Sequence, residues 1–244
     1  MVHKLAIIAV IGLSASAVCM GAAAAIGGRE LGKSFDGIDF SMFGDRPRCE
    51  RGDSASVTSR DIDWDGSDHV SLSVGGRASY TPGSDDKVHL TGDSQMLAHV
   101  RVRDGRIEMN CRGWRGDRGE LTITLPGREF KKFGIAGSGN LVLHNLDQER
   151  LKVSIAGSGN IKADGKVEHA EIHIAGSGDA DLGAVKSQVT EVHIAGSGNT
   201  DIAPTEEAEI HIAGSGDVNL HANPKRLNTH IAGSGRIHNR YSGG

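Results

Sequence analysis

The second half of the chain repeats one pattern of apolar and polar positions, in which alternating residues lead into a glycine-rich corner. The segment Ile-Ala-Gly-Ser-Gly occurs six times, at steps of 20, 19, 20, 18 and 19 residues, and begins at Ile135, Ile155, Ile174, Ile194, Ile212 and Ile231. Alternation with a period of two predicts strands that face a core on one side. A fixed period near twenty residues predicts that these strands stack as the coils of a β-solenoid.

Alignment of the repeats on this corner predicts which side chains fill the interior. Two columns precede the repeated Ile by two and four residues: Val153, Ile172, Val192, Ile210 and Thr229, and Leu151, Ala170, Thr190, Ala208 and Leu227. Two more columns follow the corner: Leu141, Ile161, Ala180, Thr200 and Val218, and Leu143, Ala163, Leu182, Ile202 and Leu220. Each coil is therefore expected to contain at least two short strands joined by the corner, with a looser polar return.

The first half of the chain has strand signals without an obvious repeat and no helical periodicity of useful length. The signals lie at residues 70–74, 88–90, 99–102, 106–109 and 121–125, with turn clusters between them. We therefore expect an all-β protein in one continuous domain. Residues 26–126 form an irregular β-rich half that caps or continues the solenoid, and residues 127–240 form about six regular coils of 18–20 residues.

The first 25 residues have the features of a secretory signal peptide. Lys4 supplies a positive start, residues 5–20 are apolar, and the alanines at 22–25 offer a cleavage site. Later apolar stretches are broken by charges and glycines, so no transmembrane span is expected after removal of the signal. Two cysteines then remain, Cys49 and Cys111, and an oxidising compartment favours a disulfide between them. The formal net charge of −4 gives no reason to expect a nucleic-acid partner.

One polar column follows the corner directly and reads Asn140, Asn160, Asp179, Asn199 and Asp217, with Arg236 at its end. A calcium-binding solenoid is expected to stack carboxylates here, but no two Asp fall on adjacent coils. Each carboxylate can instead accept a hydrogen bond from a neighbouring amide. The column is therefore interpreted as a structural ladder, with calcium as the alternative.

A second polar column lies immediately before the repeated Ile, with a carboxylate column two residues earlier on the same outward face. The imidazoles are His173, His193, His211 and His230, and the carboxylates are Glu171, Glu191 and Glu209. One hypothesis is a surface site for zinc or another transition metal, and another is a response to pH. The plainer interpretation is that these residues fill solvent-facing positions and balance one another, since equally spaced His do not converge on a tetrahedral site.

A third outward column is acidic and comprises Asp181, Asp201 and Asn219. Paired carboxylates on a β-helix can serve polysaccharide cleavage, so a carbohydrate-active enzyme is an alternative. Two observations oppose it: no Phe, Trp or Tyr occurs between Gly134 and Arg240, and the corner serines are six copies of one position without a unique base.

The Gly-Ser-Gly-Asn/Asp corners, the leader segment and the upstream strands ending at residues 121–126 resemble the head GIN domain family of putative autotransporter adhesins. The resemblance covers about Ser34 to Arg240. It implies a right-handed parallel β-helix in an exported protein of a Gram-negative bacterium, in the periplasm, at the outer surface or secreted. It supplies no catalytic residues and no cofactor.

The function expected from these observations is that of a noncatalytic bacterial envelope or secreted protein, an adhesion or surface-interaction module whose partner is a cell-surface glycan or another envelope component. The first alternative is a metal- or pH-responsive periplasmic module that uses the His and Glu columns. The second is a carbohydrate-active enzyme.

Overall fold

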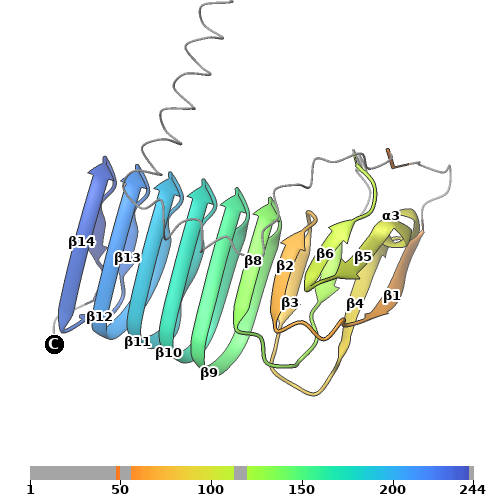
Figure 1. The fold of residues 1–244 in the computed structure, drawn as a ribbon, viewed down its shortest axis with the longest axis horizontal. Coiled ribbons are helices and arrows are strands. Elements are labelled where there is room, and N and C mark those ends of the chain that lie inside the picture. The colour runs from red at the N-terminus through yellow and green to blue at the C-terminus, as the bar shows by residue number, and fades with distance from the viewer. Residues whose placement is uncertain (1–47, 50–55, 113–119, 242–244) are drawn as a thin grey trace, which may run out of the picture. The chain divides into compact units, whose positions relative to one another are not determined.

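The structure is a computed structural model, and it describes residues 48–49, 56–112 and 120–241, which are nearly all β (Figure 1). The predicted signal peptide at residues 1–25 lies outside the described residues. Within the described ranges, no helix is both long and apolar enough to cross a membrane.

The elements follow one another as short strands and then as long ones. The first set contains a single helix, α3 (Ser94–His99), among β1 (Val57–Asp63), β2 (His69–Ser73), β3 (Arg77–Tyr80), β4 (Lys87–Asp93), β5 (Val100–Arg103), β6 (Arg106–Met109), β7 (Thr122–Thr124) and β8 (Lys132–Gly137). The second set is β9 (Asn140–Gly157), β10 (Asn160–Gly176), β11 (Ala180–Gly196), β12 (Thr200–Gly214), β13 (Val218–Leu220), β14 (Arg226–Gly233) and β15 (Ile237–Asn239).

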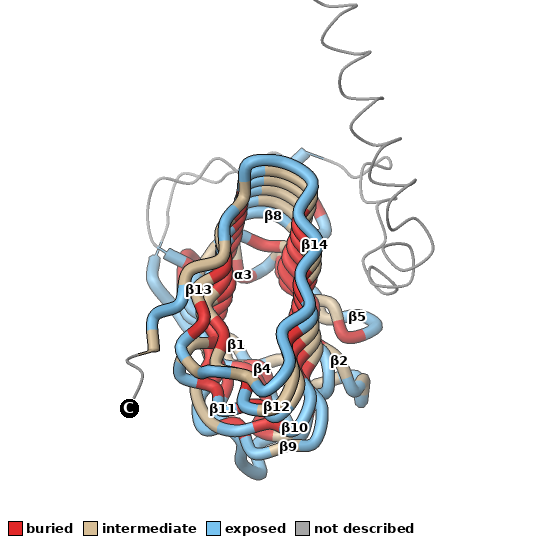
Figure 2. Tube along the Cα trace, turned by 90° about the vertical axis from the view of Figure 1, so that its left-hand side faces the viewer, coloured by how far each residue is buried: buried red, intermediate tan, exposed pale blue. Residues whose placement is uncertain are grey.

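The second set forms the predicted parallel β-solenoid. The repeated Ile residues pair in register, from Ile135 with Ile155 through to Ile212 with Ile231. Each long strand runs down one wall, bends through the return and climbs the other wall, so that the corners superpose when the coils are viewed end-on (Figure 2). The six corners delimit about five turns, one fewer than the expected number of coils.

Unequal coil lengths are absorbed on the return side and not at the corner. Register shifts lie between Lys162 and Asp164 in the β10–β11 pair, and between Asp181 and Lys186 in the β11–β12 pair. The residues that lead into the corner keep strict register through every coil. The corner is therefore the constant part of the architecture.

The solenoid continues into the first half of the chain. β2 pairs in parallel with β8, and β3 pairs in parallel with β9, so Leu72 stands beside Ile135 and Arg77 beside Asn140. β6 and β7 then stack outside β2 and β3, although they come later in the sequence. This coil escaped sequence analysis because its corner, Val74 to Arg77, lacks the repeated motif.

Antiparallel strands close the N-terminal end of the solenoid. β5 pairs with β6, β4 pairs with β7, and β1 pairs with β4. The helix α3 begins after Asp93, whose side chain accepts hydrogen bonds from the N–H groups of Gln95 and Met96, a normal N-cap. Cys49 and Cys111 form the predicted disulfide near this end.

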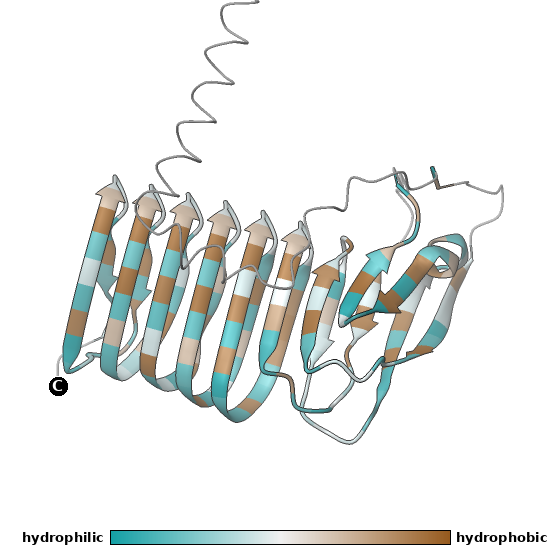
Figure 3. Ribbon diagram, viewed as in Figure 1, coloured by the Kyte–Doolittle hydropathy of each residue, from teal (hydrophilic) through white to brown (hydrophobic). Residues whose placement is uncertain are grey.

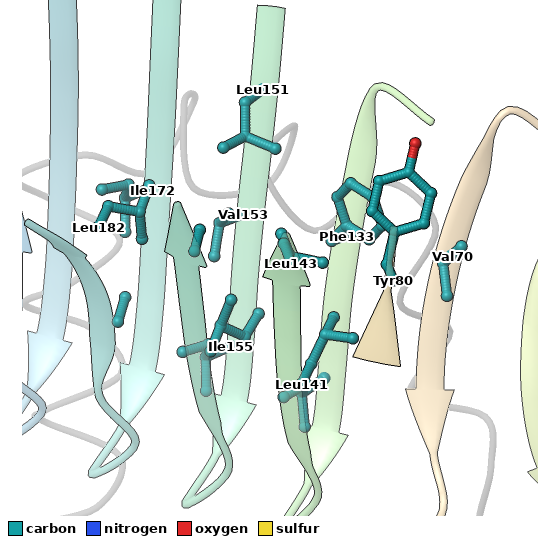
Figure 4. Packing of buried hydrophobic residues seen from close by; sticks show 14 of the residues in the cluster. Val70, Tyr80, Phe133, Leu141, Leu143, Leu151, Val153, Ile155, Ile172 and Leu182 are labelled. Carbon is teal, nitrogen blue, oxygen red and sulfur yellow. The ribbon is translucent and has the colours of Figure 1, made fainter. Parts of the chain in front are cut away.

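The core runs between the two walls along the length of the solenoid. Apolar bands alternate with polar ones along each long strand and recur from one strand to the next (Figure 3), and the labelled apolar side chains point into the space between the walls (Figure 4). The predicted inward columns are buried, except at the last coil, where Leu227 and Ile231 are 43% and 42% exposed. At the other end, Tyr80, Phe130 and Phe133 form an aromatic cluster with Trp64. Burial of each large apolar side chain contributes about 1.5–3 kcal/mol.

Polar residues at inward positions have hydrogen-bond partners inside the core. The Thr200 hydroxyl donates to the carbonyl oxygen of Ala180 over 2.8 Å, and the hydroxyls of Ser187 and Thr190 lie 2.7 Å apart. These bonds offset the cost of burying hydroxyl groups in an apolar interior.

The corner requires glycine where coils stack most closely. Gly196 has φ of +137°, and a Cβ at this position would lie 2.1 Å from the carbonyl oxygen of Gly176 on the preceding coil. An L-residue would be strained by the dihedral angle and blocked by the neighbouring backbone. The repeated glycine thus sets how tightly the coils pack.

Candidate functional site

A polar hollow of about 390 Å³ lies beside the corner on the wall formed by the first parts of β11 and β12 together with β13 and β15. It is lined by Asp179, Ala180, Asp181, Asn199, Asp201, Asp217, Asn219, His238 and Arg240. The structure therefore brings together the second half of the corner ladder and the third outward column, which the sequence presents as separate features.

The corner residues are joined from coil to coil by hydrogen bonds. The Asn160 side-chain amide donates to Asn140 Oδ1 over 3.0 Å. From there the side chain of each coil accepts from the backbone N–H of the next ladder residue, at 3.1 Å for Asp179, 2.7 Å for Asn199, 2.9 Å for Asp217 and 2.8 Å for Arg236. The Asn199 amide also donates to Asp179 over 3.1 Å.

These bonds hold the ladder side chains in one orientation. At the end of the ladder, burial raises the pKa of Asp217, but hydrogen bonds from the Arg236 backbone and from the side chains of His238 and Arg236 outweigh it and leave this pKa below its ordinary value. A carboxylate is thereby kept ionised within the hollow.

The outward column beside the ladder is also paired between coils. Lys162 donates to Asp181 over 2.7 Å, a ring nitrogen of His221 lies 2.6 Å from Asp201, and Arg240 donates to Asn219 over 3.1 Å. The polar side chains of this wall are therefore largely paired with side chains of neighbouring coils. Each carboxylate retains free acceptor positions, because an ionised carboxylate can accept up to four hydrogen bonds.

The His column lies on the opposite wall and forms a stack of imidazole rings. The ring centroids of His173 and His193 are 4.9 Å apart, those of His193 and His211 are 5.0 Å apart, and those of His211 and His230 are 5.7 Å apart. The first three rings each direct Nε2 to the Glu two residues earlier, with a distance of 2.5 Å for His193 and 2.9 Å for His211.

His173 departs from the expectation of a solvent-facing position. The residue is 1% exposed, its Nε2 contacts the carboxylate of Glu171, and its ring stacks on that of His193. Burial lowers its pKa, and the hydrogen bond with Glu171 opposes this shift without overcoming it. Its Nδ1 is buried and has no hydrogen-bond partner in the described part of the chain.

Glu171 is the electrostatic counterpart of this buried ring. The hydrogen bond from His173, together with one of 2.8 Å from the Lys152 ammonium, lowers the pKa of Glu171 to about 2, although partial burial acts in the opposite direction. The arrangement is that of a neutral imidazole donating to a carboxylate.

The geometry of the His stack does not converge on a metal position. Among the described residues, no group of three or more His, Cys, Asp or Glu could hold a metal ion. The rings lie parallel, and the Nε2 atoms of His173, His193 and His211 are already engaged by carboxylates. A tetrahedral zinc site needs ligand atoms directed at one point.

The charged and polar side chains of the hollow are Asp, Asn, His and Arg, and its lining contains no Ser, Thr, Cys or Lys. Its side chains offer hydrogen-bond acceptors and a few donors, arranged in rows that repeat from coil to coil.

Comparison with known proteins places this architecture in a family. Residues 68–224 match the family model described as "Putative auto-transporter adhesin, head GIN domain". The chain belongs to this family. The matched residues run from the start of β2 to the end of β13, so the match covers most of the solenoid and of its N-terminal cap and leaves out β1, β14 and β15. A comparison with curated proteins finds no match.

The chain is similar to several solved structures, and the likeness to the first one described shows the fold. A putative adhesin from Bacteroides fragilis is 18% identical with a TM-score of 0.60, and the alignment covers 76% of this chain and 98% of that one. A putative adhesin from Parabacteroides distasonis is 16% identical over 76% and 98% of the two chains, with a TM-score of 0.49. A putative lipid binding protein from the same organism is 18% identical over 75% and 96%, with a TM-score of 0.47.

Proposed function

We propose that this head GIN domain is a noncatalytic adhesion module of the cell envelope, and that the polar hollow beside the corner binds a hydroxyl-rich surface such as a glycan. The observation that carries the proposal is the hollow itself, in which carboxylate and carboxamide groups of three successive coils lie side by side. Family membership supports the adhesive role and an exported or surface location.

The chemistry of the hollow suits sugar hydroxyls. Asp and Asn side chains are planar acceptors, and Asn also donates, so they can bind neighbouring hydroxyl groups in pairs. Stacked coils place equivalent groups roughly 4.8 Å apart. An extended glycan would therefore meet the same contact on successive coils.

The hollow has no Phe, Trp or Tyr in its lining, and its polar side chains are largely paired with neighbouring side chains. Each individual contact is expected to be weak, and attachment would result from many modules acting together, since linked weak contacts add strongly in effective affinity. This is the behaviour expected of an adhesive surface and not of a deep ligand pocket.

A glycan array with an Asp181→Ala, Asp201→Ala double variant tests the proposal. The wild-type protein, displayed multivalently on beads, is expected to bind a subset of glycans, and the double variant is expected to lose at least about tenfold in apparent affinity, equivalent to about 1.4 kcal/mol. The matched control is Glu191→Ala, Glu209→Ala, which removes the same charge from the same two coils on the opposite wall.

Three results would count against the proposal. They are the absence of binding by the wild type, equal losses in both double variants, and release of a shortened glycan product. The last result would instead identify an enzyme.

A further inference from the structure

The two ends of the solenoid differ in whether further strands cover the edges of the parallel stack. At the N-terminal end, antiparallel strands β1, β4 and β5 close the parallel stack. Within the described residues, β14 at the C-terminal end pairs with β12 on one side only. All eight residues of β14 are exposed.

The exposed edge presents apolar side chains that the inner coils bury. Leu227 and Ile231 occupy the same columns as Ala208 and Ile212, which are 0% and 2% exposed. On the neighbouring wall of the last coil, Ile237 and Tyr241 are partly buried and pack against the core. The uncovered apolar surface is therefore concentrated on β14.

The β14 edge also lacks the usual devices that prevent edge-to-edge pairing. Its only Lys, Arg, Asp or Glu is Arg226, which forms an ion pair of 2.6 Å with Glu207, and the strand has no proline and no register shift. By contrast, β1 carries Arg60, Asp61 and Asp63, and β5 carries Arg101 and Arg103. Charged residues on an edge strand oppose pairing with another chain.

We propose that β14 is a docking edge for a second copy of this chain, and that two copies join through their C-terminal ends by antiparallel pairing of β14 with β14. The sequence of the strand is self-complementary in the register centred on Thr229. In this register Leu227 faces Ile231 of the second copy, and Thr229 faces its own equivalent.

Directly opposed residues in an antiparallel pair point to the same face of the sheet. The contact of Leu227 with Ile231 of the second copy therefore covers the exposed apolar ends of both cores. On the outer face, Asn228 opposes His230 of the second copy, and Arg226 opposes Ala232. No like charges are brought together. The interface is isologous, so association stops at the dimer.

Sedimentation velocity of the protein purified after expression of the full-length chain tests the inference. Monomer is expected at low concentration and dimer as the concentration approaches about 1 mM, the range of weak association. Ile231→Lys places a charge in the interface and should raise the dissociation constant at least about tenfold. Val57→Lys introduces the same charge at an exposed position of β1 and should change the constant by less than about twofold.

A cysteine at the centre of the register supplies a second measurement that does not depend on the lysine variants. Opposed Cα atoms in an antiparallel pair are about 4.5–5.5 Å apart, within the range that a disulfide spans. Thr229→Cys should therefore give a dimer on mild oxidation that reductant reverses, and Val57→Cys should not.

A wild-type protein that stays monomeric at every concentration would overturn the inference, because the β14 edge would then be covered by something other than a second copy. Dimers that Thr229→Cys fails to cross-link would place the interface elsewhere. Species larger than a dimer, sensitive to Val57→Lys, would show head-to-tail stacking and would also overturn it.

Discussion

The backbone N–H of Asn199 donates a hydrogen bond of 2.7 Å to the side chain of Asp179, which lies one coil earlier in the solenoid. The Asn199 amide donates to the same carboxylate, and the Asn199 Oδ1 in turn accepts from the N–H of Asp217. A neutral side chain therefore separates two carboxylates while serving as both donor and acceptor. This alternation explains why the ladder can contain two Asp residues without adjacent like charges.

Asn199→Asp should destabilise the fold by about 1–2 kcal/mol, because it removes one donor and places three carboxylates on consecutive coils. Part of this loss should be recovered at high salt, which screens exposed charges. Urea denaturation at low and high ionic strength measures both effects. Asn140→Asp is the control: its neighbours are Arg77 and Asn160, so it should cost less than about 0.5 kcal/mol. Equal losses in the two variants would contradict a role for alternation.

Gly196→Ala should destabilise the protein by at least about 3 kcal/mol, since its Cβ would meet the carbonyl oxygen of Gly176 at 2.1 Å while φ is +137°. Gly137→Ala provides a matched comparison. Its φ is +123°, but nothing lies within 4 Å of the added atom, so only the backbone strain remains, about 1–2 kcal/mol. Comparison of the two variants by thermal unfolding separates the cost of the steric contact from the cost of the backbone strain. If Gly196→Ala lost less stability than Gly137→Ala, the close approach of the coils at the corner would be contradicted.

Acid should weaken the fold in two steps. The pKa of His173 is lowered by burial, so the unfolded chain binds this proton first, and stability should fall as the pH drops below 6.5. The pKa of Glu171 is lowered to about 2 from 4.5, so its contribution is present above pH 4.5 and is lost as the pH falls toward 2. The melting temperature should therefore stay level from pH 8 down to 6.5 and decline on further acidification to pH 3.

His173→Ser should flatten the upper part of this profile, between pH 7 and 5. Serine is the natural residue at the equivalent position of the preceding coil, Ser154, and it does not titrate. His211→Ser is the control, since His211 is more exposed, with a side chain 39% accessible. If the profile kept its slope in His173→Ser and lost it in His211→Ser, the pH dependence would arise from His211. That result would contradict the prediction.

Cys111→Ser should lower the stability by about 4 kcal/mol in the chain-entropy model, because the disulfide with Cys49 closes a loop of 62 residues. The expected signature is a lower melting temperature with an unchanged circular dichroism spectrum at 20 °C. Reductant should lower the melting temperature of the wild type and leave that of the variant unchanged. If reductant left the melting temperature of the wild type unchanged, the disulfide would not stabilise the fold and the prediction would be wrong.

Much of the solenoid could be predicted because its determinants are local and repeated. Period-two alternation placed Val153, Ile172 and Ile194 inward, and all three are buried. The β2–β3 coil was missed because its corner has Val74-Gly75-Gly76-Arg77 in place of Gly-Ser-Gly-Asn. The stacking of β6 outside β2, against the order of the sequence, depends on contacts between distant segments that no periodicity reports.

The residue columns of the candidate site could be predicted from the sequence, but the surface that these columns form together could not. Alternation indicates the direction of a side chain, whereas its exposure depends on neighbours in other coils, and His173 is buried for that reason. Conversely, Leu227 was expected inside and is exposed, because no described strand follows β14 on that wall. The pair of Lys162 with Asp181 follows from the repeat, because both stand two residues after the corner ladder. The contact of His221 with Asp201 does not, because Asp201 stands opposite Asn219 in the register.

The strict register of the corner makes each coil an interchangeable segment of a rod. Neighbouring coils from β9 to β12 meet through the same Gly–Gly contact and the same Ile–Ile pair, and differences in length are confined to the return. Duplication or deletion of one whole coil would therefore alter neither the cap nor the last strand. It would change the distance between them in steps of about 4.8 Å. The length of such a protein can therefore change in evolution through the number of its coils, while the sequences of its two ends stay the same.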